Sequence, residues 1–167
     1  MQFVFLVLTL FLLSGCSTKF VQKHKLPSRP HSTSQQPTYK LKSDSSIKVA
    51  LYNEYRKWDK TPYRLGGNSF SGVDCSSLVQ SIYKDSLGVS VPRTTRDQAK
   101  VGYWVAKNQL KEGDLLLFKT GYNVRHSGIY LENGNFINAS TKHGVTISSI
   151  HNPYWKSKYW QSRRVIP

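Results

Sequence analysis

The spacing of apolar residues along the sequence changes at Lys111-Glu112-Gly113, and this change limits the fold to one class. Before it, apolar residues recur at helical spacing between Ile47 and Trp58 and again between Leu78 and Tyr83. After it, short apolar runs alternate with turn residues, which is typical of β-strands. Helices followed by an antiparallel sheet predict an α+β domain.

The ends of the predicted elements are marked by capping and helix-breaking residues. The first helix begins at Asp44-Ser45, and Thr61-Pro62 ends it, because the residue before a proline avoids the α region. A short helix capped by Thr94 or Thr95 follows the second long helix. Predicted strands cover residues 114–119, 126–131, 135–140, 145–150 and 161–166.

Asp74 and Cys75 lie where a glycine- and serine-rich loop, residues 66–73, gives way to the second helix. Aspartate is a preferred N-cap, since its carboxylate accepts backbone N–H groups that the first turn leaves unpaired. Cys75 would then be the first residue of a helix that ends at Gly88, and the positive end of the helix dipole favours a thiolate there. This position predicts a nucleophilic cysteine.

His126 and Asn138 lie on two strands joined by Glu132-Asn133-Gly134. A three-residue connection with Gly134 in the left-handed conformation puts both side chains on one face of the sheet, whereas a two-residue loop would separate them. The three-residue register pairs Leu131 with Asn135, Gly128 with Asn138, and His126 with Ser140.

Cys75, His126 and Asn138 together are suited to thiol acyl transfer. The thiolate attacks a carbonyl carbon, and the imidazole takes the thiol proton and later gives a proton to the leaving amine. Asn138 can accept a hydrogen bond from one ring nitrogen and so fix the tautomer. Backbone N–H groups at the start of the Cys75 helix are candidate oxyanion donors, and no cofactor is expected.

Other interpretations of these residues stay open. Cys75 and His126 are compatible with an inert buried thiol and a structural imidazole. Together with His143 they could hold a metal, although the spacing is not that of a zinc site. Gly66-Gly67 lacks the following lysine of a phosphate loop. Four aromatic residues are expected to be part of the core that closes the last strand, with stacking on carbohydrate as the alternative: Tyr154, Trp155, Tyr159 and Trp160.

The first residues are typical of an exported chain. Residues 1–13 are almost entirely apolar, and Leu13-Ser14-Gly15-Cys16 resembles a bacterial lipobox, so we expect residues 1–15 to be a signal peptide and Cys16 to be lipidated. No lysine or arginine precedes the apolar run, which leaves an ordinary signal peptide or an uncleaved anchor as alternatives. A lipidated Cys16 could not form a disulfide with Cys75.

Residues 16–43 are predicted to be the lipidated N-terminus and a disordered tether, since proline and polar residues dominate them; residues 44–167 form the predicted domain. The net charge of +15, from 24 Lys+Arg and 9 Asp+Glu, favours polyanionic partners. For an exported chain these are cell-envelope components and membrane lipids rather than nucleic acid. The sequence does not indicate an oligomeric state.

Several motifs in order resemble the NlpC-type papain-like cysteine peptidases, over about residues 45–166. These motifs are Thr61-Pro62-Tyr63-Arg64-Leu65-Gly66-Gly67, Val73-Asp74-Cys75-Ser76-Ser77-Leu78-Val79, Glu112-Gly113-Asp114-Leu115, His126-Ser127-Gly128-Ile129-Tyr130, Phe136-Ile137-Asn138-Ala139-Ser140-Thr141 and Tyr154-Trp155 to Arg163-Arg164. The resemblance implies a papain-like fold, in which the catalytic cysteine opens a helix packed on a small antiparallel sheet.

The resemblance also implies hydrolysis of amide bonds in peptidoglycan stem peptides, either between D-γ-glutamate and diaminopimelate or at a cross-link. It makes Cys75 the nucleophile, His126 the base and Asn138 the third polar residue. By the same resemblance Tyr63 lies near the oxyanion, and Asp74 and Ser76 help to hold the peptide.

The sequence departs from the pattern of the family at two positions. The third catalytic position is commonly His in the family and is Asn138 here, and Ser77 replaces a frequent glycine.

The alternatives to a peptidase function are an acyltransferase or amidase and a catalytically inactive wall-binding lipoprotein. Ser17 after Cys16 resembles outer-membrane sorting, so the expected location is the bacterial envelope, on the periplasmic face of the outer membrane.

Overall fold

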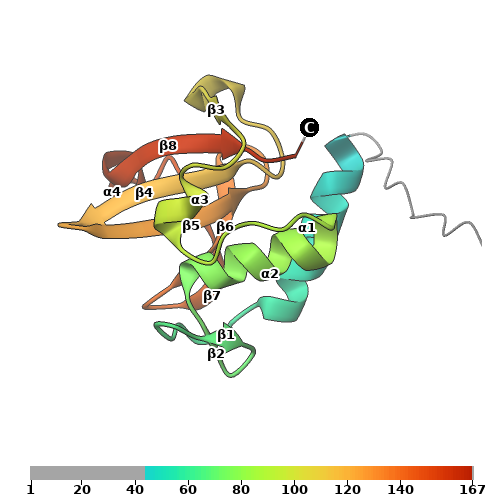
Figure 1. The fold of residues 1–167 in the computed structure, drawn as a ribbon, viewed down its shortest axis with the longest axis vertical. Helices are drawn as coiled ribbons and strands as arrows, with labels where there is room; N and C mark the ends of the chain where they lie inside the picture. Colours follow the sequence, from blue (N-terminus) through green and yellow to red (C-terminus); the bar gives the residue numbers. More distant parts are fainter. Residues whose placement is uncertain (1–43, 167) are drawn as a thin grey trace, which may run out of the picture. The chain divides into compact units, whose positions relative to one another are not determined.

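The computed structural model of the chain describes residues 44–166 (Figure 1). The predicted signal peptide, the lipidation site Cys16 and the predicted tether lie outside the described residues. Within the described range, no helix has the length and apolar character needed to cross a membrane.

Helices dominate the first half of the described chain and strands the second. The helices are α1 (Asp44–Trp58), α2 (Cys75–Leu87), α3 (Thr95–Gln98), a 3₁₀ turn (Lys107–Gln109) and α4 (Pro153–Lys158). The strands are β1 (Asn68–Ser69), β2 (Gly72–Val73), β3 (Tyr103–Val105), β4 (Leu115–Gly121), β5 (Val124–Tyr130), β6 (Asn135–Ser140), β7 (Gly144–Ser149) and β8 (Tyr159–Arg164). This arrangement confirms the α+β prediction.

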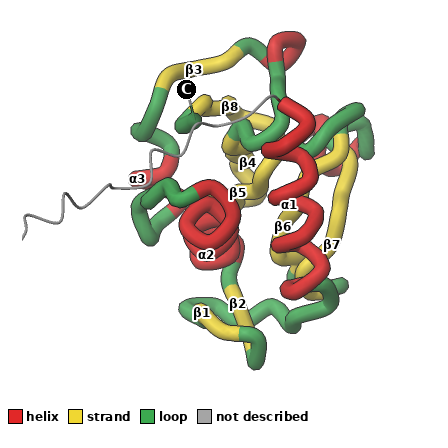
Figure 2. The backbone as a smooth tube through the Cα atoms, turned by 90° about the vertical axis from the view of Figure 1, so that its right-hand side faces the viewer, coloured by secondary structure: helices red, strands yellow, loops and turns green. Residues whose placement is uncertain are grey.

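Six of the strands form one antiparallel sheet in the order β3-β8-β4-β5-β6-β7, and β1 pairs with β2 in a separate hairpin. Figure 2 shows α1 and α2 side by side in front of the sheet, and α2 contacts β5 and β6. The N-terminus of α2, where Cys75 lies, is therefore carried close to the central strands.

Alternating residues of the strands build a core on each face of the sheet, as a period of two requires. Leu115, Leu117 and Ile129 pack against the helices, in the larger cluster. Leu116 and Phe118 point the other way and pack with Phe136 and with Trp155 of α4. The helix α4 thus covers the face opposite α1 and α2.

The positions of the two long helices and the register of the central hairpin were predicted from local sequence, and the structure confirms both. Asp74 caps α2 and Gly88 ends it with φ of 67°, a conformation that favours glycine. In the hairpin Gly134 has φ of 81°, and Ile129 pairs with Ile137 in the predicted register. Thr94, rather than Thr95, caps α3.

Four features were not predicted: the β1–β2 hairpin, the edge strand β3, the 3₁₀ turn and the helix α4. The first is built inside the loop that precedes Cys75. Asn152 caps α4 by accepting from the Tyr154 N–H, and Pro153 takes a first-turn position that suits proline. The expectation that Tyr154 packs in the core is wrong, since its side chain is 50% exposed. Trp155, Tyr159 and Trp160 do pack against the core.

Candidate active site

Cys75 is the first residue of α2, and its thiol is free and buried at 7% exposure. Its position follows from the cap, because the Asp74 carboxylate accepts the Ser77 N–H at 2.8 Å and starts the helix one residue before the cysteine. The other N–H groups at the start of α2, those of Cys75 and Ser76, have no partner inside the helix and lie near the sulfur. The sulfur is therefore placed beside hydrogen-bond donors.

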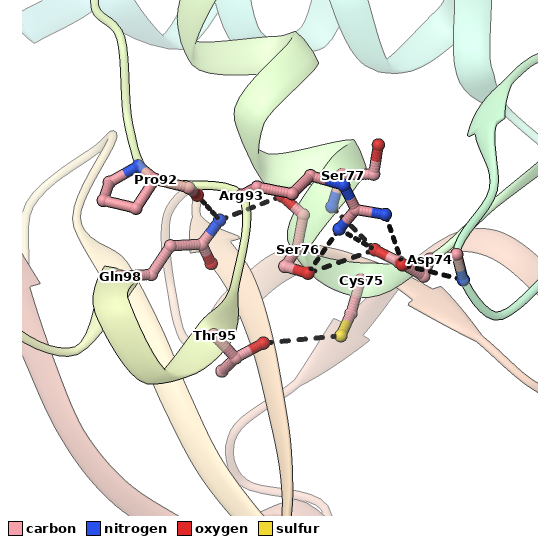
Figure 3. A network of polar contacts seen from close by, with 9 residues as sticks. Asp74, Cys75, Ser76, Ser77, Pro92, Arg93, Thr95 and Gln98 are labelled. Carbon is pink, nitrogen blue, oxygen red and sulfur yellow. Dashed lines mark hydrogen bonds and ion pairs between the residues drawn. The ribbon is translucent and has the colours of Figure 1, made fainter.

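The Asp74 carboxylate is held by a network of donors (Figure 3). Its Oδ1 accepts from Ser77 N–H, from Ser76 Oγ at 3.1 Å and from Arg93 at 3.0 Å. Its Oδ2 accepts from Arg93 at 2.7 Å and from the Gly66 N–H at 3.0 Å. Burial raises the pKa of Asp74, but the hydrogen bonds and charge of Arg93 and the other donors outweigh this and lower it.

This network shows what Asp74 and Ser76 do in the folded protein. Both are 6% exposed, and the Ser76 hydroxyl also accepts from Arg93 at 3.0 Å. The two residues fasten the loop and the start of α2 around Cys75. Their expected contact with a peptide stays a prediction.

Arg93 and Gln98 connect the segment after α2 back to its first turn, and sequence reasoning missed both. Gln98 donates to the Ser76 carbonyl at 2.9 Å and to the Pro92 carbonyl at 2.9 Å (Figure 3). Neither residue type carries a signal of its own, since one arginine among 24 basic residues looks like any other. The positions become informative only once the fold brings them to Asp74 and Ser76.

Thr95 lies beside the sulfur, with its Oγ1 3.8 Å from the Cys75 Sγ. Figure 3 shows the thiol pointing toward this hydroxyl from the start of α2. Thr95 is only 8% exposed and is the first residue of α3. A hydroxyl there can donate to a thiolate, so Thr95 is a further functional candidate.

His126 lies near the start of β5, with the ring of Trp155 stacked on it at 5.0 Å between centroids. Burial lowers the pKa of His126 to about 4, and a hydrogen bond with Asn138 acts in the opposite direction. The imidazole is therefore neutral near pH 7, which is the form that can accept a proton.

Asn138 is fully buried in β6, behind His126. Its Nδ2 donates to Ser148 Oγ at 2.8 Å and, more weakly, to the Thr146 carbonyl at 3.4 Å. The Asn138 Oδ1 and the His126 Nε2 are both buried and meet no partner at full hydrogen-bond geometry. We take the two atoms as partners, because they are complementary and Asn138 acts on the His126 pKa as a hydrogen-bonding group.

Cys75, His126 and Tyr63 line one cavity of about 510 Å³. Burial raises the pKa of Tyr63, and the neighbouring Cys75 and Asp74 raise it further, so its hydroxyl stays protonated and can donate. The cavity thus brings together the predicted nucleophile, base and oxyanion donor, with Asn138 directly behind the base.

The metal site and the phosphate loop, which the sequence left open as alternatives, do not form within residues 44–166. His143 is exposed and lines the same cavity, yet no group of three His, Cys, Asp or Glu side chains among residues 44–166 could hold a metal ion. The Gly66 N–H donates to Asp74, and the Gly67 N–H donates to the Arg64 carbonyl at 2.9 Å. Neither amide is available to a phosphate.

Comparison with known proteins agrees with this geometry. Residues 60–164 match the NlpC/P60 family. The chain is 39% identical to the probable endopeptidase NlpC of Escherichia coli, over 99% of this chain and 100% of that one. It is 37% identical to the murein DD-endopeptidase MepS/murein LD-carboxypeptidase of E. coli, over 93% and 87%. A solved NlpC/P60 family protein from Bacillus cereus superposes with a TM-score of 0.65 at 31% identity, over 72% of this chain and 40% of that one.

Proposed function

The chain belongs to the NlpC/P60 family, and from this premise we propose that it is a lipid-anchored cysteine endopeptidase of peptidoglycan stem peptides. One observation carries the proposal. Cys75 at the start of α2 and His126 on β5 line the same cavity, and the buried Asn138 lies behind the histidine. A nucleophile, a neutral base and a group that orients the base are what amide hydrolysis through a thioester requires.

Catalysis begins when the neutral imidazole of His126 takes the Cys75 proton and the sulfur attacks the peptide carbonyl. With Nε2–H directed at Asn138, Nδ1 is the ring nitrogen left for this transfer. First-turn N–H groups of α2 and the Tyr63 hydroxyl stabilise the oxyanion. The imidazolium then protonates the leaving amine, and water attacks the thioester with His126 again as the base.

The bond that we propose is the peptide cross-link rather than the D-γ-glutamyl–diaminopimelate bond. Support comes from the E. coli relative, a murein DD-endopeptidase that is similar along nearly the whole of this chain. The name of this relative also includes a murein LD-carboxypeptidase, so trimming of stem peptides is a second reaction to look for.

The proposal that the protein is anchored to a membrane rests on the sequence of its first residues. We propose that residues 1–15 are removed, that Cys16 is lipidated and that residues 17–43 let the domain reach the wall from the outer membrane. The basic surface suits a polymer whose stem peptides carry free carboxylates.

Digestion of purified sacculi in ¹⁸O-labelled water tests the proposal. The protein should release muropeptides whose new carboxyl ends carry ¹⁸O, and their masses would identify the bond. Transfer products without ¹⁸O would support the acyltransferase alternative. Binding to sacculi without any release would support the wall-binding alternative.

A further inference from the structure

Two cations face each other on the outer part of the β4–β5 hairpin. Lys119 and Arg125 are register partners in these antiparallel strands, so their side chains leave the sheet side by side. Like charges directly opposite one another destabilise a strand pair. Such a pair of cations indicates a site for an anionic ligand when no acidic group of the protein neutralises the two charges.

Both cations lie over the same aromatic ring. The Lys119 Nζ is 4.7 Å and the Arg125 Cζ 5.5 Å from the centroid of Trp160. The ring offsets part of the repulsion but supplies no hydrogen-bond acceptor to the guanidinium. The Arg125 Nε is buried without a hydrogen-bond partner, and the ion pairs of the described residues all use other cations.

Arg125 also connects this cation pair to the active site. It precedes His126 in the chain and lines the same cavity as His126 and Cys75. It lines, in addition, a hollow of about 240 Å³ at the hairpin tip, together with Lys119. No aspartate or glutamate lines either space. An anionic part of a substrate in the active-site cavity would therefore meet Arg125, and one that extended into the hollow at the hairpin tip would meet Lys119 as well.

We infer that Lys119, Arg125 and Trp160 form a carboxylate-binding site that selects stem peptides with a free carboxylate beside the scissile bond. The inference rests on the proposed function and assigns a specificity site to it. A guanidinium presents donors in the geometry of a carboxylate, while Lys119 adds charge and Trp160 fixes both side chains over its ring.

The test measures binding and cleavage separately. Binding is measured by calorimetry in the Cys75→Ala background, with a cross-linked dimer of diaminopimelate-containing stem tetrapeptides in its free carboxylate form and in forms amidated at the diaminopimelate or at the C-terminal carboxylate. Arg125→Gln should weaken binding of the free form about tenfold, because a charge-assisted hydrogen bond is lost. It should leave binding of one of the amidated forms unchanged, and that form identifies the carboxylate.

Lys84→Gln is the matched control, since it removes one exposed positive charge on α2 outside both spaces. In cleavage assays Arg125→Gln and Lys119→Gln should raise KM for the free peptide with little change in kcat. Thermal unfolding should show that neither variant is less stable than the wild type, because each removes a like-charge repulsion.

Equal binding of free and amidated peptides by the Arg125-containing protein would overturn the carboxylate site, as would an equal loss of binding in Lys84→Gln. If peptides bind with the predicted preference but wild type cleaves none of them, the proposed peptidase function fails while the binding site stands.

Discussion

The Asn138 amide donates to the Ser148 hydroxyl at 2.8 Å, from β6 to the neighbouring strand β7. Because this bond uses the amide nitrogen, the Asn138 carbonyl oxygen is the amide atom left for the His126 ring. If His126 is the base, as proposed, its orientation depends on a serine that belongs to none of the sequence motifs. We therefore propose Ser148 as a positioning residue.

Ser148→Ala should lower kcat about fivefold with little change in KM, because the loss of one neutral hydrogen bond loosens the Asn138 amide. Steady-state cleavage of a purified muropeptide measures both constants. Ser157→Ala, on the exposed side of α4, is the control. A Ser148→Ala enzyme with unchanged kcat would show that Asn138 holds its orientation without this bond.

Thr95→Val should slow alkylation of Cys75 by iodoacetamide about tenfold at pH 7, since the hydroxyl that can donate to the thiolate is removed with little change in shape. Thr95→Ser keeps the hydroxyl and should react nearly as fast as wild type. Equal rates for all three proteins would leave Thr95 with a packing role only. The 3.8 Å contact between Oγ1 and Sγ is the structural basis of this prediction.

Arg93→Met should destabilise the fold by about 2 kcal/mol, because it leaves the buried Asp74 carboxylate without its counter-ion. The loss is smaller than for a fully buried ion pair, since Arg93 is partly exposed to solvent. Lys100→Met breaks the exposed pair with Asp97 and should cost much less stability, because solvent screens that pair. Urea unfolding compares the two. Equal losses would mean that the Asp74 network contributes no more than a surface ion pair.

His126 makes stability depend on pH in a defined window. The unfolded chain protonates this side chain near pH 6.5, but burial lowers the folded pKa to about 4. Between these values the unfolded state binds more protons, so stability falls as pH decreases from 6.5 to 4. The Tm of wild type should drop more steeply across this range than that of His126→Gln. Parallel Tm curves would contradict the buried, neutral imidazole.

Local chemistry made part of the site predictable from sequence. An aspartate before an amphipathic run caps a helix wherever that helix packs, so Cys75 could be placed at a helix start. The turn at Gly134 fixes the register of its hairpin, and the register puts His126 and Asn138 on one face. Both inferences needed only residues that are close to one another in the sequence.

The remaining site residues come from segments that only the tertiary fold brings together. Thr95 and Arg93 reach the start of α2 from the next segment, and Ser148 reaches Asn138 from another strand. Trp155 stacks on His126 from α4, a helix that the sequence did not reveal because aromatic residues also suit strands. No spacing rule links such positions.

The rate of muropeptide release from purified sacculi by wild type and by Cys75→Ala tests the central claim most directly. Circular dichroism would first show that both proteins are folded. The Cys75 acyl-enzyme mechanism predicts that the variant is slower by about 10³-fold or more, because loss of a nucleophile removes the covalent route. Release at the wild-type rate by Cys75→Ala would contradict the assignment of Cys75 as the nucleophile.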